Sequence, residues 1–315
     1  MTQVVDMRDA FFDGLYKYIA KDKNVIILTA DHGAFGLKKI ESDYPEQYLN
    51  VGIAEQTLIS VAAGLAMCGK KVYVYAINNF VSLRVLEQIN IDLCAMNLDV
   101  NIIGVGAGFT YSTDGPTHQG VQDLAAMINL PNLQVYNVTD DLNTQKLVDL
   151  SYTLPGPKYF RLEKGKLPRI YEEKDDIMLG FKEISTRSSK IGVISTGFMT
   201  QVAKEVLENL EENSAINVSH LDIYSMSPIP TPKIIEFSSK KHIITLEENI
   251  KSGGFGEKIN SILKHAGHSK NILNLAADNR FYFEFGDRQL LHEKAGLDKQ
   301  SIGAAIQSFY NNKQL

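Results

Sequence analysis

The chain has 315 residues, of which 44% are hydrophobic and 22% are charged, and this composition excludes disordered and fibrous proteins. Its length exceeds the usual size of one compact domain, so we expect two domains with separate cores. A formal net charge of -5 argues against a binder of nucleic acids or acidic membranes, because such proteins gather Lys and Arg on one face. A small molecule or another protein is the expected partner.

Helical and strand patterns alternate through the first half of the chain. Asp6 is a suitable N-cap, and apolar residues recur at helical spacing from Met7 to Ile19. Further helices are expected at 56–66, 81–96 and 144–150, and strands at 25–28, 71–76, 100–105, 133–138 and 159–162. Helices that alternate with buried strands predict a parallel sheet with helices on both faces, which is a doubly wound α/β fold.

A second pattern of the same class follows a polar segment. Strands are expected at 191–195, 217–223, 242–247 and 271–276, and the segment Glu172-Glu-Lys-Asp-Asp176 is a suitable linker. We therefore expect a first domain at 1–170, a linker at 171–187 and a second, smaller α/β domain at 188–315.

The sequence gives little sign of secretion or membrane insertion. Cys68 and Cys94 are too few for a disulfide framework, and we expect both to be reduced thiols in the core. The first residues lack the basic patch and apolar stretch of a signal peptide, and no apolar run reaches membrane-spanning length. A cytoplasmic location without membrane contact is the resulting expectation.

Candidate site residues lie on loops that follow strands, where doubly wound folds bind their ligands. Glu55 precedes a helix of small apolar residues, and it is either a charge at the positive helix end or a poorly solvated carboxylate that shares a proton. In the long 106–120 loop, Asp114 and His118 suit acid–base chemistry near neutral pH, although Asp and Gly-Pro are also common in turns. His32 follows the first strand, and both a structural and a functional role are open for it.

The glycine clusters at 104–108 and 252–256 match neither the dinucleotide fingerprint nor a phosphate loop, so we expect tight turns there.

Five motifs follow one another along the chain. They are Asn50-Val-Gly-Ile-Ala-Glu-Gln56, Ala62-Ala-Gly-Leu-Ala66, Phe80 with Arg84 and Glu87-Gln88, Asp114-Gly-Pro-Thr-His-Gln119, and Leu246-Glu-Glu-Asn-Ile-Lys-Ser-Gly-Gly-Phe-Gly256. In this order and spacing they resemble transketolases and deoxyxylulose-phosphate synthases, and the resemblance covers nearly the whole chain.

The resemblance implies that the first domain binds the pyrimidine of thiamine diphosphate and that the second is a transketolase C-terminal domain without a direct catalytic role. Glu55 is implied to share a proton with the pyrimidine ring, which leads to loss of the thiazolium C2 proton. Phe80 is implied to stack on the pyrimidine, and Arg84 belongs to the same cofactor-binding group.

The resemblance also implies the substrate site. Asp114 and His118 match positions that contact donor hydroxyls, His118 assists proton transfer, and His32 is a further substrate-binding residue. Either Arg161 or Lys164 matches the place of a phosphate-binding arginine, and a lysine there would act as a point charge.

One departure from the family pattern concerns the acceptor. Seven or eight residues before Asp114, relatives have a His or Arg directed at the substrate, whereas this chain has Gly106 and Ala107. A modified or non-phosphorylated sugar as acceptor is therefore a hypothesis beside the usual sugar phosphate.

The family's signature for magnesium and diphosphate, Gly-Asp-Gly followed downstream by Asn, is missing from the sequence. The resemblance therefore implies an N-terminal transketolase subunit that holds the diphosphate and Mg2+, no metal site in this chain, and an α2β2 assembly. The implied reaction transfers a two-carbon ketol unit from a ketose to an aldose. The alternatives are a decarboxylating subunit, like deoxyxylulose-phosphate synthase or the E1 beta chain of 2-oxo acid dehydrogenases, and a non-catalytic regulatory subunit.

Overall fold

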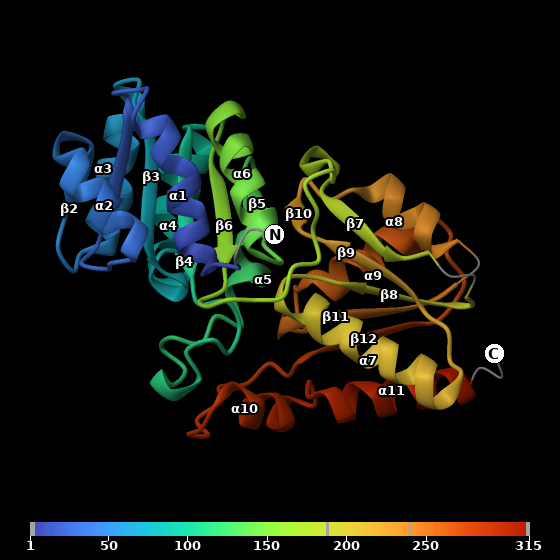
Figure 1. The fold of residues 1–315 in the computed structure, drawn as a ribbon. Coiled ribbons are helices and arrows are strands. Elements are labelled where there is room, and N and C mark those ends of the chain that lie inside the picture. Colours follow the sequence, from blue (N-terminus) through green and yellow to red (C-terminus); the bar gives the residue numbers. More distant parts are fainter. Residues whose placement is uncertain (1–3, 187–188, 240, 313–315) are drawn as a thin grey trace.

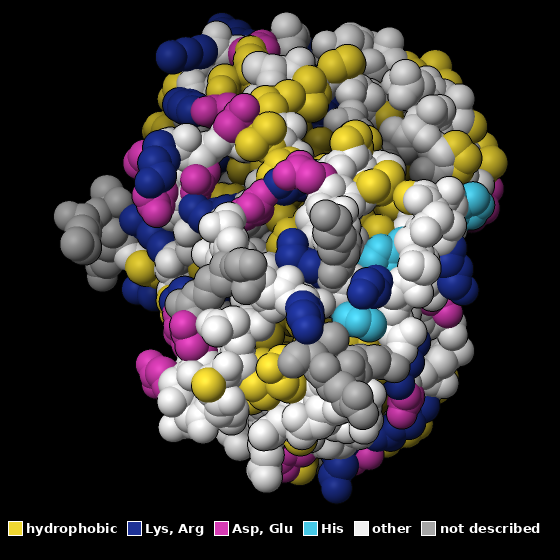
Figure 2. All heavy atoms as spheres, turned by 90° about the vertical axis from the view of Figure 1, so that its right-hand side faces the viewer, with side chains coloured by type: hydrophobic (Ala, Val, Ile, Leu, Met, Phe, Trp, Pro, Cys, Tyr) yellow, Lys and Arg dark blue, Asp and Glu magenta, His cyan; other side chains and the backbone are white. Residues whose placement is uncertain are grey.

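The computed structural model describes residues 4–186, 189–239 and 241–312, and these form two α/β domains (Figure 1). Both domains have mostly parallel sheets with helices on both faces, so the predicted fold class is confirmed. Figure 2 shows the end of the molecule at the second domain, where basic and acidic side chains both occur. Within the described ranges, no helix has the length and apolar character needed to cross a membrane.

The first domain contains a seven-stranded sheet with the order β10-β5-β6-β4-β3-β1-β2. Every residue of the central strands β4 and β6 is buried, as expected where helices cover both faces. Strand β10 comes from the second half of the chain and pairs antiparallel with β5, whereas the other pairs are parallel. The strands are β1 (Val25–Thr29), β2 (Tyr48–Asn50), β3 (Lys71–Ile77), β4 (Val100–Val105), β5 (Gln134–Asn137), β6 (Lys158–Leu162) and β10 (Ser225–Ser227).

Two layers of helices pack against this sheet. One layer consists of α1 (Met7–Ile19), α2 (Phe35–Asp43) and α6 (Asp141–Thr153), and the other of α3 (Glu55–Met67), α4 (Leu86–Gln88) with its flanking turns, and α5 (Asp123–Met127). The carboxylate of Asp6 accepts a hydrogen bond from the N–H of Arg8 at 2.9 Å, which confirms the predicted N-cap.

The helix expected at 81–96 is not continuous. Leu83–Val85 is a 3-10 turn, Leu86–Gln88 is a single α-helical turn, and Ile89–Ala95 is a π-helix. Apolar spacing predicts a helical segment here but does not distinguish an α-helix from one with widened turns.

The second domain contains a five-stranded sheet with the order β12-β11-β8-β9-β7, in which only the edge strand β7 is antiparallel. One face is covered by α7 (Phe198–Ser214), α10 (Arg288–Ala295) and α11 (Lys299–Asn312), and the other by α8 (Thr231–Ser238) and α9 (Phe255–His265). The strands are β7 (Phe181–Ser185), β8 (Ile191–Ser195), β9 (Ser219–Ile223), β11 (His242–Ile250) and β12 (Ile272–Ala277).

The segment expected to be the linker is partly folded into the second domain. Phe181–Ser185 pairs with β9, and Lys182 and Glu183 give this half-buried edge strand a polar sequence that resembles a linker. The boundary expected between 187 and 188 lies outside the described residues. Cys94 is buried as expected, but Cys68 is exposed at the end of α3, so the prediction of two core thiols is wrong for Cys68.

A buried carboxylate joins the two domains. Asp222 on β9 accepts hydrogen bonds from the hydroxyls of Thr139 at 2.8 Å, Tyr171 at 2.6 Å and Thr200 at 2.6 Å. Burial raises the pKa of Asp222 to about 6, although these hydrogen bonds act in the opposite direction. Because Thr139 and Tyr171 precede β7, Asp222 fixes the end of the first domain against the second sheet.

Candidate active site

The predicted site residues lie on segments that follow β1, β2, β3, β4 and β6, except Arg161, which lies within β6. These strands run parallel, so the segments after them meet at one edge of the first sheet. This edge bears the side chains of Glu55, Phe80 and His118.

Glu55 is the first residue of α3 and is only 4% exposed. Its Oε2 lies 2.8 Å from Nη1 of Arg84, whereas its buried Oε1 has no hydrogen-bond partner among the described residues. The helix end alone explains a charge at this position. It does not explain a buried oxygen without a donor, because such an oxygen is costly unless a ligand supplies one.

Phe80 lies in a 3-10 turn directly after β3 and connects the other side chains. The guanidinium of Arg84 lies over its ring at 3.8 Å, and the rings of His118 and His32 lie 5.0 Å and 5.8 Å from it. The structure therefore brings together Glu55, Arg84, Phe80, His118 and His32. A planar ring that stacks on Phe80 would use the face that Arg84 leaves free, or it would displace Arg84.

His118 is half-buried, and the loop that carries it is hydrogen-bonded to the side chain of Asn79. The side-chain amide of Asn79 donates to the carbonyls of Thr117 at 3.2 Å and Gln119 at 2.9 Å. Nδ1 of His118 lies 2.9 Å from the hydroxyl oxygen of Thr117, which leaves Nε2 for a substrate. Nδ1 of His32 is buried and has no hydrogen-bond partner within the described part of the chain.

The remaining predicted residues separate into two groups. Asp114 and Lys164 are exposed at the rim of the site. Arg161 is 2% exposed, and its Nε donates to Asp123 at 2.7 Å while its other groups donate to Asn137 and to the carbonyl of Gly120. These partners engage the buried guanidinium of Arg161, whereas the side chain of Lys164 is exposed.

Asp123 is a structural residue that the sequence did not reveal. Its carboxylate accepts hydrogen bonds from Tyr159 at 2.9 Å and Asn78 at 3.0 Å, and Asn249 of the second domain donates to its other oxygen at 3.3 Å. With Arg161, these residues form a buried network beneath the 106–120 loop. Each of them belongs to an ordinary helix, strand or turn pattern, so only the tertiary structure identifies the network.

A second ionic cluster connects the C-terminal domain to the same loop. Arg288 donates to Glu163 at 2.8 and 2.9 Å and to Glu248 at 2.9 Å, while His292 lies 2.5 Å from Glu248. Thr110 donates to Glu163 at 2.5 Å. Burial acts to raise the pKa of Glu248, but the charges of Arg288 and His292 outweigh it and hold that pKa well below its usual range.

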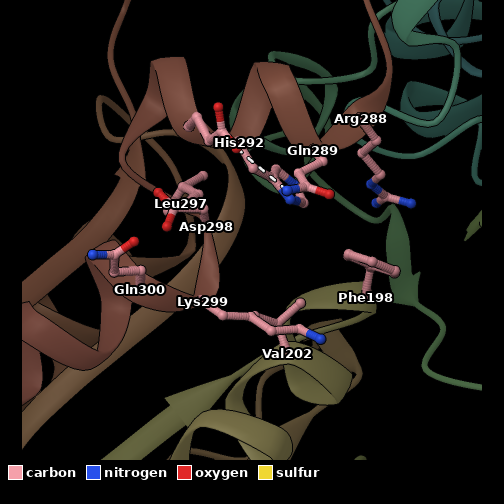
Figure 3. A pocket seen from close by; sticks show the side chains of 10 residues that line it. Phe198, Val202, Arg288, Gln289, His292, Leu297, Asp298, Lys299 and Gln300 are labelled. Atoms are coloured by element: carbon pink, nitrogen blue, oxygen red, sulfur yellow. Dashed lines mark hydrogen bonds between the residues drawn. The ribbon is translucent and has the colours of Figure 1, made fainter.

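A cavity of about 460 Å³ lies next to this cluster, between α7, α10 and the start of α11 (Figure 3). Arg288 and His292 line it together with Phe198, Val202 and Lys299. None of the site residues predicted from the sequence lies on its wall. In the described residues, no group of three or more His, Cys, Asp or Glu side chains is placed to hold a metal ion.

The residues around Glu55 fit the pyrimidine end of thiamine diphosphate. The free Oε1 would accept a hydrogen bond from a protonated ring nitrogen, and Phe80 would offer an aromatic face to a planar ring. The fit concerns this end of the cofactor alone.

Comparison with known proteins identifies the family. The model "Transketolase, pyrimidine binding domain" matches residues 3–169, and "Transketolase, C-terminal domain" matches residues 182–302. A 1-deoxy-D-xylulose-5-phosphate synthase of Dehalococcoides mccartyi is 32% identical over 308 residues, which cover 96% of this chain and 47% of that protein. The chain thus spans about half the length of the synthase.

Two other relatives are matched over nearly their full length. An apulose-4-phosphate transketolase subunit of Phocaeicola vulgatus is 30% identical over 302 residues, which cover 95% of this chain and 96% of that subunit. A solved structure described as a split-gene transketolase, inactive β4 tetramer, has a TM-score of 0.84 and 27% identity, and the match covers 97% of this chain and 98% of that one. This chain comprises a pyrimidine-binding domain and a C-terminal domain of the transketolase type, and it belongs to the transketolase family.

Proposed function

We propose that this chain is the pyrimidine-binding subunit of a thiamine-diphosphate-dependent transketolase, and that a separate N-terminal subunit holds the diphosphate and Mg2+. The proposed reaction transfers a two-carbon ketol unit from a ketose to an aldose. Glu55 carries the proposal: Arg84 fixes one of its carboxylate oxygens, and the other is buried without a donor among the described residues.

Thiamine diphosphate supplies a carbon nucleophile at C2 of its thiazolium ring when it is bound. Glu55 would hold a proton at the pyrimidine ring nitrogen through Oε1, while Arg84 keeps Oε2 in place at 2.8 Å. Phe80 would orient the pyrimidine by stacking. His118 would exchange a proton with the substrate through Nε2, because Thr117 engages Nδ1.

The exposed apolar side chains at the site support a partner subunit. Phe35 and Ile53 are 77% and 78% exposed on the segments that flank His32 and Glu55. Large exposed apolar groups beside a functional site are typical of protein interfaces. The relatives matched over nearly their full length are named as a subunit and as a split-gene product, which supports a separate partner chain. The assembly that we propose contains two copies of each chain, α2β2.

A second group of exposed apolar side chains lies on the C-terminal domain. Phe281, Phe283 and Phe285 alternate along one extended segment and are 58%, 77% and 82% exposed, whereas Tyr282 between them is buried. The amide of Gln119 donates to the carbonyl of Tyr282 at 3.1 Å, so this segment adjoins the loop that carries His118. A partner that covers the site would also cover these rings.

Reconstitution tests the proposal. The chain and an N-terminal transketolase subunit, mixed with thiamine diphosphate and Mg2+, should transfer a ketol unit, and neither chain should do so alone. Phe283→Ser should weaken subunit binding about tenfold, while Met178→Ser, which removes an exposed methionine between the domains, should not. Turnover or tight cofactor binding by the isolated chain would contradict the proposal.

The decarboxylating synthase is the second candidate because it is 32% identical to the chain. Pyruvate separates the two reactions: a decarboxylating subunit consumes pyruvate in the presence of an aldehyde or of ferricyanide, whereas a transketolase uses a ketose. Glu55→Ala distinguishes a catalytic chain from a regulatory subunit. The activity of the assembled enzyme would stay unchanged in this variant if the chain had no catalytic role.

A further inference from the structure

The position at which this chain departs from the family pattern is filled by another side chain. Gly106 follows β4 with a φ of +98°, a conformation that favours glycine. A Cβ atom on Gly106 would overlap carbons Cε2 and Cδ2 of the Tyr111 ring. The ring of Tyr111 therefore lies directly against the backbone where any other residue would carry its side chain.

Tyr111 continues the line of contacts that begins at the cofactor side of the site. Its ring centroid lies 6.1 Å from that of His118, which in turn lies 5.0 Å from Phe80. On its other side, Nζ of Lys164 lies 5.1 Å from the centre of the Tyr111 ring. The contacts thus lead from Phe80 through His118 and Tyr111 to an exposed cation.

Both Tyr111 and Lys164 are available to a ligand. Tyr111 is half-buried, and its hydroxyl forms no hydrogen bond with any residue that the structure describes. Burial raises the pKa of Tyr111, so the hydroxyl keeps its proton near neutral pH and can donate it in a hydrogen bond. Lys164 is exposed and has no ion-pair partner in the described ranges.

We propose that Tyr111 is a substrate-contacting residue that selects the acceptor: an aldose whose carbon chain lies along the Tyr111 ring and whose terminal tetrahedral anion reaches Lys164. The Tyr111 hydroxyl donates a hydrogen bond to an oxygen of that acceptor. An aldehyde too short to pass His118 does not touch Tyr111. This inference rests on the proposed ketol transfer.

The test uses the complete two-subunit enzyme with hydroxypyruvate as donor and two acceptors. D-Glyceraldehyde 3-phosphate carries a terminal anion, whereas glycolaldehyde is short and neutral. Tyr111→Ala should lower kcat/KM for the phosphate about tenfold and leave that for glycolaldehyde within about twofold. Tyr111→Phe keeps the ring and should cause a smaller loss of the same selectivity, and Lys164→Gln should resemble Tyr111→Ala.

The remaining measurements separate substrate contact from a structural role. Tyr310→Phe, which alters a half-buried tyrosine on α11, serves as the control and should change neither acceptor. An equal loss for both acceptors in Tyr111→Ala, or no loss for either, would overturn the role of Tyr111 while the wild-type activity upheld the ketol transfer. Tyr111→Phe gives the same decision if the alanine variant does not fold. No turnover of either acceptor by the wild-type enzyme would overturn the proposed function and this inference with it.

Discussion

At the scale of single residues, Asn79 determines where His118 lies. Its side-chain amide donates to the carbonyls of Thr117 and Gln119, on both sides of the histidine. Asn79 is itself 9% exposed and follows β3 in the same turn as Phe80. One side chain therefore sets the distance between the ring expected to stack on the cofactor and the histidine expected to move a proton.

Replacement of Asn79 by alanine should release this loop. Two backbone carbonyls lose their donor, so we expect about 1–3 kcal/mol lower stability by urea denaturation and about tenfold lower kcat in the assembled enzyme. Asn129→Ala is the control, since the exposed Asn129 donates to the carbonyl of the nearby Ala125 and lies outside the loop that carries His118. An unchanged kcat in Asn79→Ala would show that the loop holds His118 without this contact.

Residue patterns predicted the position of Glu55 but not its role. The sequence places it at the start of a helix, where a carboxylate is stabilised by the helix dipole whether or not it is functional. Oε1 of Glu55 is unpaired because Arg84 contacts Oε2 and no other donor among the described residues reaches Oε1. This arrangement is set by the tertiary structure. Arg161 shows the reverse, because its motif position predicts a substrate contact, whereas its side chain is buried in β6 and is engaged by hydrogen bonds within the chain.

At the scale of elements, α10 connects the C-terminal domain to the site. Figure 1 shows α10 at the lower edge of the molecule. Arg288, in the first turn of α10, donates to Glu163 after β6 and to Glu248 on β11. Glu163 immediately precedes Lys164 and accepts from Thr110, the neighbour of Tyr111. The C-terminal domain thus contacts residues that adjoin Tyr111 and Lys164 at the rim of the candidate site.

Removal of Arg288 should destabilise this connection strongly. Arg288→Met leaves the nearly buried Glu163 without its cation and leaves Glu248 with His292 alone. Breaking a comparable buried pair costs about 3–5 kcal/mol, and denaturant unfolding measures the loss. Arg280→Met removes an exposed pair with Glu284 and should cost less than about 1 kcal/mol. Equal losses in the two variants would mean that the cluster contributes no more than a surface ion pair.

Elements with a regular apolar pattern were predictable from the sequence, and elements defined by tertiary contacts were not. The central strands and α1 follow simple apolar periodicity and lie where expected. Strand β10 has three residues from the second half of the chain, and it is a strand through its pairing with β5 of the first domain. No local apolar pattern predicts such a strand. The π-helix at Ile89–Ala95 has the apolar spacing of an ordinary helix.

At the scale of the whole molecule, the carboxylate of Asp222, which joins the two domains, should make the free energy of unfolding depend on pH. Its pKa of about 6 exceeds the value of 3.8 for an exposed aspartate. The folded protein therefore holds a proton between about pH 4 and pH 6 that the unfolded chain has released. The stabilisation from this proton is complete below about pH 4 and is lost as the pH rises through 6.

Asp222→Asn should remove this part of the pH dependence. The free energy of unfolding, measured with urea at about pH 4.5 and about pH 6.5, should fall less across this interval in the variant than in the wild type. Asp278→Asn, which alters an exposed partner of Lys251, should keep the wild-type slope. A slope in Asp222→Asn equal to that of the wild type would assign the pH dependence to other groups.

At the scale of the assembled enzyme, the central claim of the proposed function is that this chain activates a cofactor whose diphosphate another chain holds. Exchange of the thiamine C2 proton with deuterium, followed by NMR in the two-subunit complex, tests this claim most directly because it needs no substrate. Glu55→Gln keeps the shape of the side chain and should slow the exchange by about 100-fold or more, with the complex intact and the cofactor bound. Exchange at the wild-type rate in this variant would contradict the role of Glu55 and the account built on it.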